Sequence, residues 1–395
     1  MKMYNFAIIL YKERQIIMNV IGIVCEYNPF HNGHKYQIDK IKEKYKDSII
    51  VACMSTSFTQ RGNLSIINKW DKTKCALLNG IDLVIELPYV YSTQSSDLFA
   101  KYSLNLLNML KIDTLSFGTE EDNIDHIINN AKIQVLNKNF DNLVQKYLSD
   151  GLNYPTSLNN ALKDLNGSSI DTPNDLLALS YIKEILKNNY NIDIYNIKRT
   201  NDYHDNISND TIVSSSNIRE KLNNNIDISN HIPSNTLELI KYHKYHDKLF
   251  DLLKYKIISE DNLNKYLDVD EGLSVRIKQS ILKSNNLEEL IQNIKTKRYT
   301  YNKINRMLCH ILCSFTKDEK KETENIEYIR VLGFNDKGKK YLNKIKKDIN
   351  ILNKYDTFKY KTLEIENRVS NIYSIIYEDI MKSEIQNKPI YIKVE

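Results

Sequence analysis

The first 200 residues alternate short apolar runs with longer stretches of helical periodicity, and this alternation restricts the fold more than any other feature. Buried strands are predicted at 19–27, 48–55, 82–88, 113–118 and 192–198. Helices are predicted between them, at 33–46, 68–79, 95–110, 123–150 with a break, 156–164 and 174–188. Strands that alternate with helices in this way form a parallel sheet covered on both faces. We therefore predict an α/β fold, a Rossmann-like doubly wound parallel sheet.

The pattern changes after about residue 230, where helical periodicity dominates. Residues 231–395 are predicted to form a second, mostly α-helical and basic domain, in which 326–345 adds a strand or a turn before a basic helix. Residues 18–230 are predicted to form the first domain, which contains the parallel sheet. Residues 1–17 read as an N-terminal extension, because Met18 directly precedes the first strand and is a plausible natural start.

Positive charge is concentrated in the second half of the chain. Residues 1–230 carry 24 Lys and Arg against 26 Asp and Glu, whereas residues 231–395 carry 31 against 24. Most of the excess lies in 295–347, with 15 positive and 6 negative residues. This distribution indicates a polyanionic partner held by the C-terminal half. A Lys-rich solvated surface explains the charge nearly as well.

Cysteine spacing and apolar runs indicate the compartment. The five cysteines are scattered and lack CxxC pairs, which argues against a disulfide framework and a zinc site. No apolar run approaches the roughly 20 residues that span a bilayer. We therefore expect a cytoplasmic protein without a metal site formed by its own side chains.

Two histidines follow the first predicted strand, in "CEYNPFHNGHKYQ" (25–37). His31 and His34 are three residues apart at the start of a helix, so their side chains share a face at its N-terminus. Helix N-termini attract phosphate, and Gly33 would let a nucleotide approach the backbone closely. The imidazoles can donate hydrogen bonds to phosphate oxygens and stabilise charge that develops during attack at phosphorus. Two surface histidines at a helix start explain the bare pattern equally well.

A second phosphate-type motif is "SSSNIREKL" (214–222). Hydroxyl groups at Ser214 and Ser216 are followed by Arg219 in the first turn of a short helix, which makes an anion site with a guanidinium suited to bidentate contact. Alone, the motif is a serine-capped helix. After the histidine turn of an α/β domain, it is interpreted as the element that holds the β and γ phosphates.

Nine segments together carry a resemblance to a known family: "GIVCEYNPFHNGH" (22–34), "SFTQRG" (57–62), "KWDKTKCALLNGIDLVIELP" (69–88), "FGTE" (117–120), "TPNDLLALSYI" (172–182), "IKR" (197–199), "YHD" (203–205), "SSSNIR" (214–219) and "TKRYTYNKINR" (296–306). They resemble the tRNA(Met) cytidine acetate ligase family, within the HIGH-type nucleotidylyltransferase superfamily. The resemblance implies a bacterial cytoplasmic ligase that activates acetate with ATP as acetyl-adenylate, releasing pyrophosphate. The acetyl group then passes to N4 of the wobble cytidine of elongator tRNA(Met).

The resemblance also implies a function for each domain and a set of site residues. Residues 18–230 are expected to be the ATP-binding catalytic domain, and residues 231–395 are expected to bind tRNA. His31, His34 and Arg219 are the expected catalytic residues, and whether Mg²⁺ accompanies ATP stays open. The expected ATP contacts are Val24, Cys25, Glu26, Tyr27, Asn28, Pro29, Phe30, His31, Asn32, Gly33, His34, Lys35, Tyr36, Gln37, Gly118, Asn174 and Arg199, with Ser214 and Ser216 added from the wider superfamily.

One departure from the family pattern concerns the substrate pocket. Thr56 stands where the family usually has glycine, so the shape of the pocket beside it is open. Arg61, in the adjacent "QRG", is equally consistent with binding a substrate anion and with a turn of the chain.

The segment "KTKRYTYNKINR" (295–306) interleaves basic residues with tyrosines, a pattern typical of RNA-binding surfaces. The expected tRNA-binding residues are Lys295, Lys297, Arg298, Lys303 and Arg306. Tyr299 and Tyr301 could stack on bases or belong to the core. Two other functions compete with tRNA acetylation: adenylyl transfer to a small phosphate-bearing substrate, and RNA binding with a vestigial nucleotide site.

Overall fold

The computed structural model describes residues 19–165, 167–199, 211–241, 244–270, 272–352, 355–377, 384 and 388–393 of the 395-residue chain. The predicted extension at 1–17 and the "YHD" segment at 203–205 lie outside the described residues.

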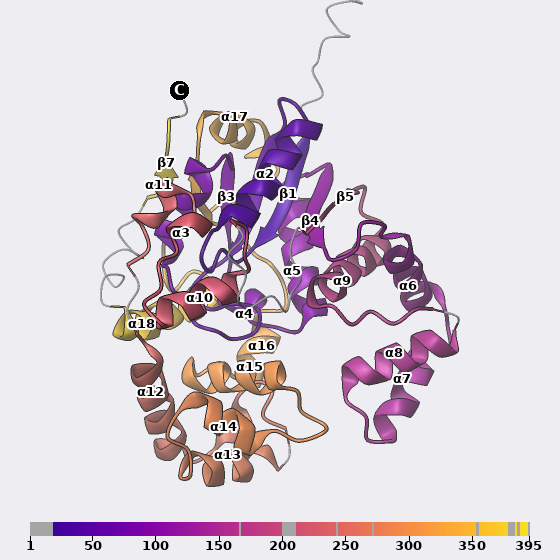
Figure 1. Ribbon diagram of the computed structural model, residues 1–395, viewed down its shortest axis with the longest axis vertical. Helices are drawn as coiled ribbons and strands as arrows, with labels where there is room; N and C mark the ends of the chain where they lie inside the picture. The colour runs from indigo at the N-terminus through magenta and orange to yellow at the C-terminus, as the bar shows by residue number, and fades with distance from the viewer. Residues whose placement is uncertain are drawn as a thin grey trace, which may run out of the picture.

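A seven-stranded sheet forms the centre of the molecule (Figure 1). Its strands are β1 (Val20–Cys25), β2 (Ile49–Ser55), β3 (Leu83–Leu87), β4 (Thr114–Thr119), β5 (Asp193–Lys198), β6 (Val331–Phe334) and β7 (Ile390–Tyr391), in the order β5-β4-β1-β2-β3-β6-β7. The first five strands are parallel, which confirms the five predicted strands and the parallel sheet. β6 pairs antiparallel with β3, a direction that the sequence pattern did not indicate.

Helices connect these strands along the described part of the chain. The N-terminal half contains α2 (Asn32–Lys44), α3 (Lys69–Leu78), α4 (Tyr89–Ser92), α5 (Ser96–Met109), α6 (Asp125–Leu136), α7 (Phe140–Ser149), α8 (Tyr154–Asp164), α9 (Pro173–Asn188) and α10 (Ser215–Asn223). The C-terminal half contains α11 (Ser234–Leu237), α12 (His246–Ser259), α13 (Leu273–Ile281), α14 (Leu287–Ile294), α15 (Tyr301–Leu312), α16 (Lys317–Glu322), α17 (Asp336–Ile345) and α18 (Lys361–Ile376). The break predicted within 123–150 separates α6 from α7.

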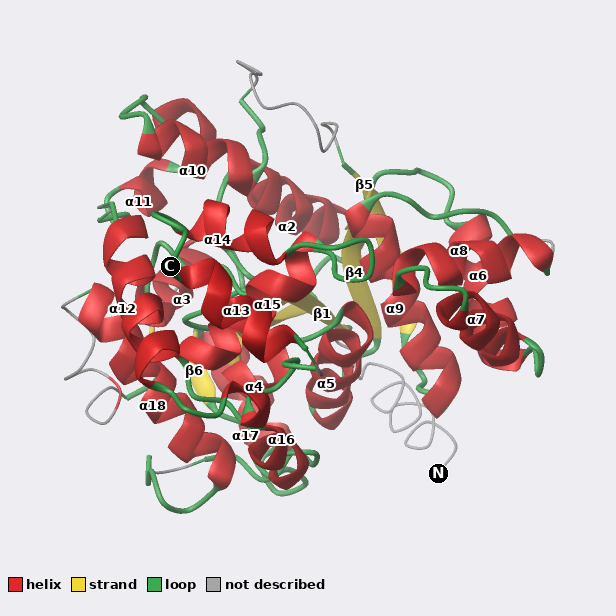
Figure 2. Cartoon of the chain, turned by 90° about the horizontal axis from the view of Figure 1, so that it is seen from below, coloured by secondary structure: helices red, strands yellow, loops and turns green. Residues whose placement is uncertain are grey.

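Alternate residues of each inner strand face opposite layers of helices. In β2, Ile50, Ala52 and Met54 pack in one core with residues of α2 and α3. Ile49, Val51 and Cys53 pack in the other core, with α5 and α9. Figure 2 accordingly shows α2 on one side of β1 and β4 and α5 on the other. The sheet is doubly wound because its strands carry apolar side chains on both faces.

The second half is mostly helical, as predicted. Helices α12 to α16 gather at one end of the molecule (Figure 1). The predicted strand within 326–345 is β6, and α17 follows it. Because β6 and β7 complete the sheet of the first half, the domain boundary at residue 230 stays a prediction. Within the described part of the chain, every helix is too short or too polar to span a membrane.

Candidate functional site

We call residues 26–34, which contain His31 and His34, the histidine turn. It lies at the carboxyl end of β1 and leads into α2. Its apolar residues Tyr27 and Phe30 are buried beneath it. The Asn28 side chain donates to the carbonyl of Leu64 at 3.2 Å and accepts from the N–H of Ile66 at 2.8 Å. The turn is therefore fixed both to the core and to the loop that follows β2.

His31 and His34 cap α2 reciprocally. Nδ1 of His31 accepts from the N–H of Gly33 at 3.0 Å, and Nδ1 of His34 accepts from the N–H of His31 at 3.2 Å. The rings are stacked, with centroids 3.8 Å apart. A neutral imidazole whose Nδ1 accepts carries its proton on Nε2. Both rings are thus held as Nε2–H donors, with their other nitrogen occupied by the backbone.

Both imidazoles are uncharged at neutral pH. Burial, followed by the charge of Arg199, lowers the pKa of His34 to about 3. Burial, then His34, Arg199 and Arg219, hold the pKa of His31 well below its usual value. The cations beside the histidines therefore supply the positive charge of the site, and the histidines supply hydrogen-bond donors.

The structure brings the second motif against this turn, although about 180 residues separate them. Nη1 of Arg219 donates to the carbonyl of Asn28 at 2.7 Å, and the Ser215 hydroxyl donates to the carbonyl of Pro29 at 3.4 Å. Ser214 is the N-cap of α10, and its hydroxyl is 2.8 Å from that of Ser216. The predicted serines and Arg219 thus lie on a helix start joined to the histidine turn.

Gly118 and Arg199 meet at the next strand end. A Cβ added to Gly118 would lie 3.4 Å from Cγ of Arg199. Nε of Arg199 is buried and has no hydrogen-bond partner among the described residues. Asn174, at the start of α9, donates to the Glu120 carboxylate at 2.5 Å. Gly118, Asn174 and Arg199 therefore lie at or beside the end of β4.

Three side chains in the predicted ATP segment point into the core. Cys25, Tyr27 and Phe30 are buried in the layer beneath the turn. Burial raises the pKa of the Cys25 thiol to about 12. Contacts of these residues with ATP stay predictions, and they would be made through the backbone.

The loop containing "QRG" connects the turn to helix α15. The N–H of Gln60 donates to the Glu26 carboxylate at 2.5 Å. Asn305 donates to the carbonyl of Arg61 at 2.8 Å. Gly62 has a φ of +82°, and a Cβ there would lie 2.9 Å from Cα of Arg306. Glycine is thus required for both the turn and the close approach of α15.

Lys72 is fully buried, although no sequence motif indicated it as part of the site. Its ammonium group donates to the carbonyls of Ser55 and Thr56 at 2.7 Å each and to that of Glu26 at 3.1 Å. Burial lowers its pKa to about 7, against the charge of Glu26. Lys72 therefore links the end of β1 to the end of β2 by hydrogen bonds. The only feature of the sequence that could have indicated its burial is its place among the apolar residues of the predicted helix at 68–79.

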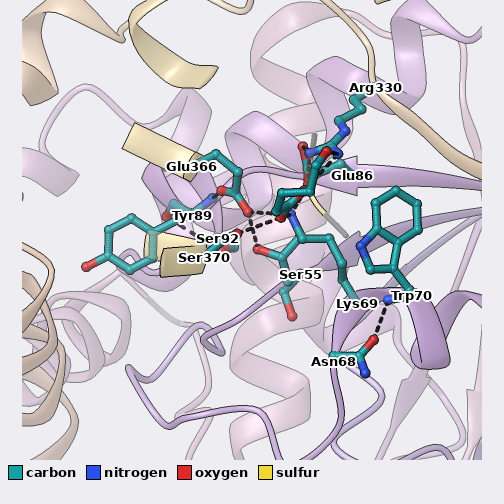
Figure 3. Close-up of polar contacts among 12 residues, drawn as sticks. Ser55, Asn68, Lys69, Trp70, Glu86, Tyr89, Ser92, Arg330, Glu366 and Ser370 are labelled. Carbon is teal, nitrogen blue, oxygen red and sulfur yellow. Dashed lines mark hydrogen bonds and ion pairs between the residues drawn. The ribbon is translucent and has the colours of Figure 1, made fainter. Parts of the chain in front are cut away.

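A buried ion cluster lies at the end of β3 (Figure 3). Lys69 lies 2.7 Å from Glu86 and 3.0 Å from Glu366, and also pairs with Glu384. Arg330 lies 3.3 Å from Glu86 and 2.8 Å from Glu384. Burial would raise the pKa of Glu384, but Lys69 and Arg330 hold it at about 2. We name these five residues the ion cluster.

Thr56 donates a hydrogen bond to the ion cluster. Its hydroxyl donates to Oε1 of Glu366 at 2.8 Å, and the N–H of Tyr89 donates to Oε2 at 2.7 Å. Thr56 is fully buried. The hydroxyl that distinguishes this chain from the usual family pattern is therefore bound to a carboxylate from α18.

The predicted RNA-binding residues do not all lie on the surface. Lys295, Lys297 and Arg298 are exposed. Lys303 is half-buried and pairs with Asp270 at 3.0 Å. Arg306 is only partly exposed, and burial lowers its pKa. The exposed charge is concentrated immediately before α15.

Comparisons with known proteins agree on one family. The family model described as HIGH Nucleotidyl Transferase matches residues 18–388. The tRNA(Met) cytidine acetate ligase of Geobacillus sp. (strain WCH70) is 36% identical over 94% of this chain and 100% of its own length. The enzyme of the same name from Caldicellulosiruptor bescii is 37% identical over 95% and 99%.

Solved structures share the fold. The crystal structure of Thermotoga maritima TmcAL bound with alpha-thio ATP superposes with a TM-score of 0.85, and its apo form I with 0.88. Each is 24% identical to this chain and covers 95% of it, and this chain covers 100% of each.

Proposed function

The chain belongs to the tRNA(Met) cytidine acetate ligase family of HIGH nucleotidyl transferases, and we infer from this premise that it is an ATP-dependent ligase that forms N4-acetylcytidine in tRNA(Met). We propose that acetate is activated as acetyl-adenylate and that the acceptor is the wobble cytidine of the elongator tRNA. The observation that carries the proposal is the pair of neutral, Nε2-protonated histidines joined to the Arg219 helix.

In the proposed first step, a carboxylate oxygen of acetate attacks the α-phosphorus of ATP and pyrophosphate leaves. Acetate is a poor nucleophile, so the rate depends on alignment and on neutralising the leaving group. The Nε2–H groups of His31 and His34 would donate to phosphate oxygens. Arg219 would balance the charge of pyrophosphate. Neither histidine needs to transfer a proton.

Other contacts would position the nucleotide. Gly33 leaves the backbone of the turn open between the two histidines, and the buried Nε of Arg199 is a donor available to a ligand beside Gly118. Asn174 would complete this side of the site. A magnesium ion that accompanied ATP would be held by the phosphates of ATP itself.

In the proposed second step, the exocyclic amine of cytidine attacks the acyl carbon of acetyl-adenylate. An N–C bond forms, AMP leaves and the amine loses a proton. The base must lie outside the anticodon stack for N4 to reach the anhydride. The exposed residues Lys295, Lys297 and Arg298 would hold the tRNA backbone by charge.

We also propose a division of labour between residues 18–230, which activate acetate, and residues 231–395, which hold tRNA. The hydrogen bonds of Asn305 to the loop after β2 support a direct link between the two. The five cysteines are all buried thiols, in keeping with a reducing, cytoplasmic site of action.

The test is to incubate the protein with ATP, labelled acetate and bulk tRNA, and to follow pyrophosphate release and the label in digested nucleosides. We expect the label in N4-acetylcytidine. Turnover that needs no acetate but needs a small phosphate acceptor would instead identify an adenylyltransferase. Binding of tRNA without any turnover would leave a non-catalytic RNA-binding protein.

A further inference from the structure

A pocket lies between the α7–α8 connection and the segment that leads into α15, which are far apart in sequence (magenta and orange in Figure 1). Its volume is about 530 Å³, within the range of small-ligand sites. It is lined by Gly151, Leu152, Asn153, Lys295, Thr296, Lys297, Tyr299, Thr300 and Tyr301. None of these lining residues is acidic, so the pocket is suited to an anion.

Two lysines and two helix starts give the pocket its positive potential. Lys295 and Lys297 are exposed. Asn153 is the N-cap of α8, and Thr300 is the N-cap of α15. The N-terminus of a helix carries partial positive charge and favours phosphate, which adds to the charge of the lysines.

Two tyrosines add flat apolar surface to the same pocket. Tyr301 is 36% exposed, and its hydroxyl donates to Glu288 at 2.7 Å, which restrains the ring. Tyr299 is partly buried, and Nζ of Lys303 lies 5.1 Å from its ring centroid. A restrained, accessible aromatic ring beside cations is a surface on which a nucleobase can stack.

We propose that this pocket binds one unstacked nucleotide of the tRNA substrate, with the base against Tyr301 and the phosphate at Lys295 and Lys297. This inference rests on the proposed function, because it takes the polyanion to be the tRNA that is acetylated. A stacking surface and a phosphate site in one pocket match one nucleotide of single-stranded RNA, whereas duplex RNA keeps its bases stacked away from the protein. The site would hold the RNA between α8 of the first half and α15 of the second.

The first test compares two substitutions of Tyr301. Tyr301→Leu removes the ring, and Tyr301→Phe keeps it and loses only the hydroxyl. Base stacking on an aromatic ring implies a roughly 5- to 150-fold weaker affinity for a tRNA(Met) transcript in Tyr301→Leu, and nearly unchanged affinity in Tyr301→Phe. Fluorescence anisotropy measures binding, and thermal unfolding shows that both variants are folded. Equal affinity of the two variants would overturn the stacking site.

The second test removes the two lysines of the pocket. In Lys295→Ala with Lys297→Ala, the slope of log affinity against log salt should be shallower by about 0.7 to 0.9, because the contact with one phosphate is lost. The matched control is Lys340→Ala with Lys344→Ala, which removes two exposed lysines of α17. Equal loss in both pairs would show a diffuse basic surface and overturn the pocket.

A measurement without tRNA separates this inference from the proposed function. Acetate-dependent exchange between ATP and pyrophosphate by the unaltered protein tests the activation step alone. Without exchange, the proposed function fails, whatever the RNA affinities are. With exchange and acetylation, but with tRNA affinity insensitive to Tyr301→Leu and to loss of the two lysines, the pocket proposal fails and the proposed function stands.

Discussion

Two polar clusters lie at carboxyl ends of strands in the same sheet, and they differ in how their hydrogen-bonding capacity is used. At the end of β1, His31 and His34 use Nδ1 for the backbone and keep Nε2–H for another partner. At the end of β3, the carboxylates of the ion cluster are bound by Lys69, Arg330, Thr56 and the backbone of Tyr89. The histidines therefore have N–H donors available for a ligand, whereas the carboxylates of the ion cluster are already bound by protein groups.

This difference explains why position alone does not identify an active site. Glu86 ends its strand at the edge where ligands of such sheets bind, yet it is fully buried and paired with Lys69 and Arg330. Buried charges require partners, and a group that already has them gains little from a substrate. The ion cluster is therefore expected to stabilise the fold, and the histidine turn to act on ATP.

The largest effect is expected from Lys69→Met, which leaves three buried carboxylates facing one cation. Breaking a buried ion pair costs about 3–5 kcal/mol, so the free energy of unfolding should fall by that amount in urea titrations. Lys74→Met, an exposed lysine on the same helix, is the control and should change it little. A loss below about 1 kcal/mol would mean that the ion cluster is not a stabilising element.

The next effect concerns catalysis. His34→Ala removes one donor to the phosphates, and loss of one such donor typically lowers rates by about 10²–10³-fold. Acetate-dependent exchange of ATP and pyrophosphate should fall by this factor, and tRNA affinity should be unchanged. His126→Ala, on α6, is the control. If His34→Ala weakened tRNA binding as much as exchange, the proposed division of labour would be wrong.

A smaller effect is expected from Thr56→Val, which keeps the shape of the side chain but removes the hydroxyl bound to Glu366. A buried carboxylate that loses a donor should cost about 1–3 kcal/mol of unfolding free energy. Thr56→Ser retains the hydroxyl and should recover most of this loss. Similar stability of the valine and serine variants would show that the bond to Glu366 is dispensable.

The smallest effect is the pH dependence of the histidine turn. His31 has a lowered pKa in the folded protein, so the unfolded chain binds the proton more readily and stability falls as pH drops below about 6.5. The loss grows as the pH falls from 6.5 to 5.5, because the unfolded chain takes up a proton that the folded His31 does not. His31→Asn retains an N-cap and cannot titrate, so its unfolding free energy should fall less than that of the parent between pH 7.5 and pH 5.5. Parallel pH profiles of unfolding for the two proteins would contradict a neutral His31.

Local patterns were sufficient for the five parallel strands of the first half, for most of the helices between them and for the position of the histidine turn. The five strands of the first half lie where β-branched runs predicted them, because apolar side chains in parallel strands face helices on both sides. The spacing of His31 and His34 predicted two side chains on one helix face. The antiparallel direction of β6 was not predictable, because a pattern of four residues does not indicate which strand they pair with or in which direction.

The sequence by itself determined the doubly wound sheet, the mostly helical second half and a turn with two histidines after the first strand, because each depends on residues close together in the chain. Only the tertiary structure decided which distant residues contact that turn. Arg219 donates a hydrogen bond to the carbonyl of Asn28, which is 191 residues away in the sequence. The tertiary structure also decided that Lys69 meets Glu366 and that Lys72 binds the ends of two strands. Hydrogen bonds and ion pairs between distant segments leave no local periodicity, and their partners are selected by how the sheet and its helices pack.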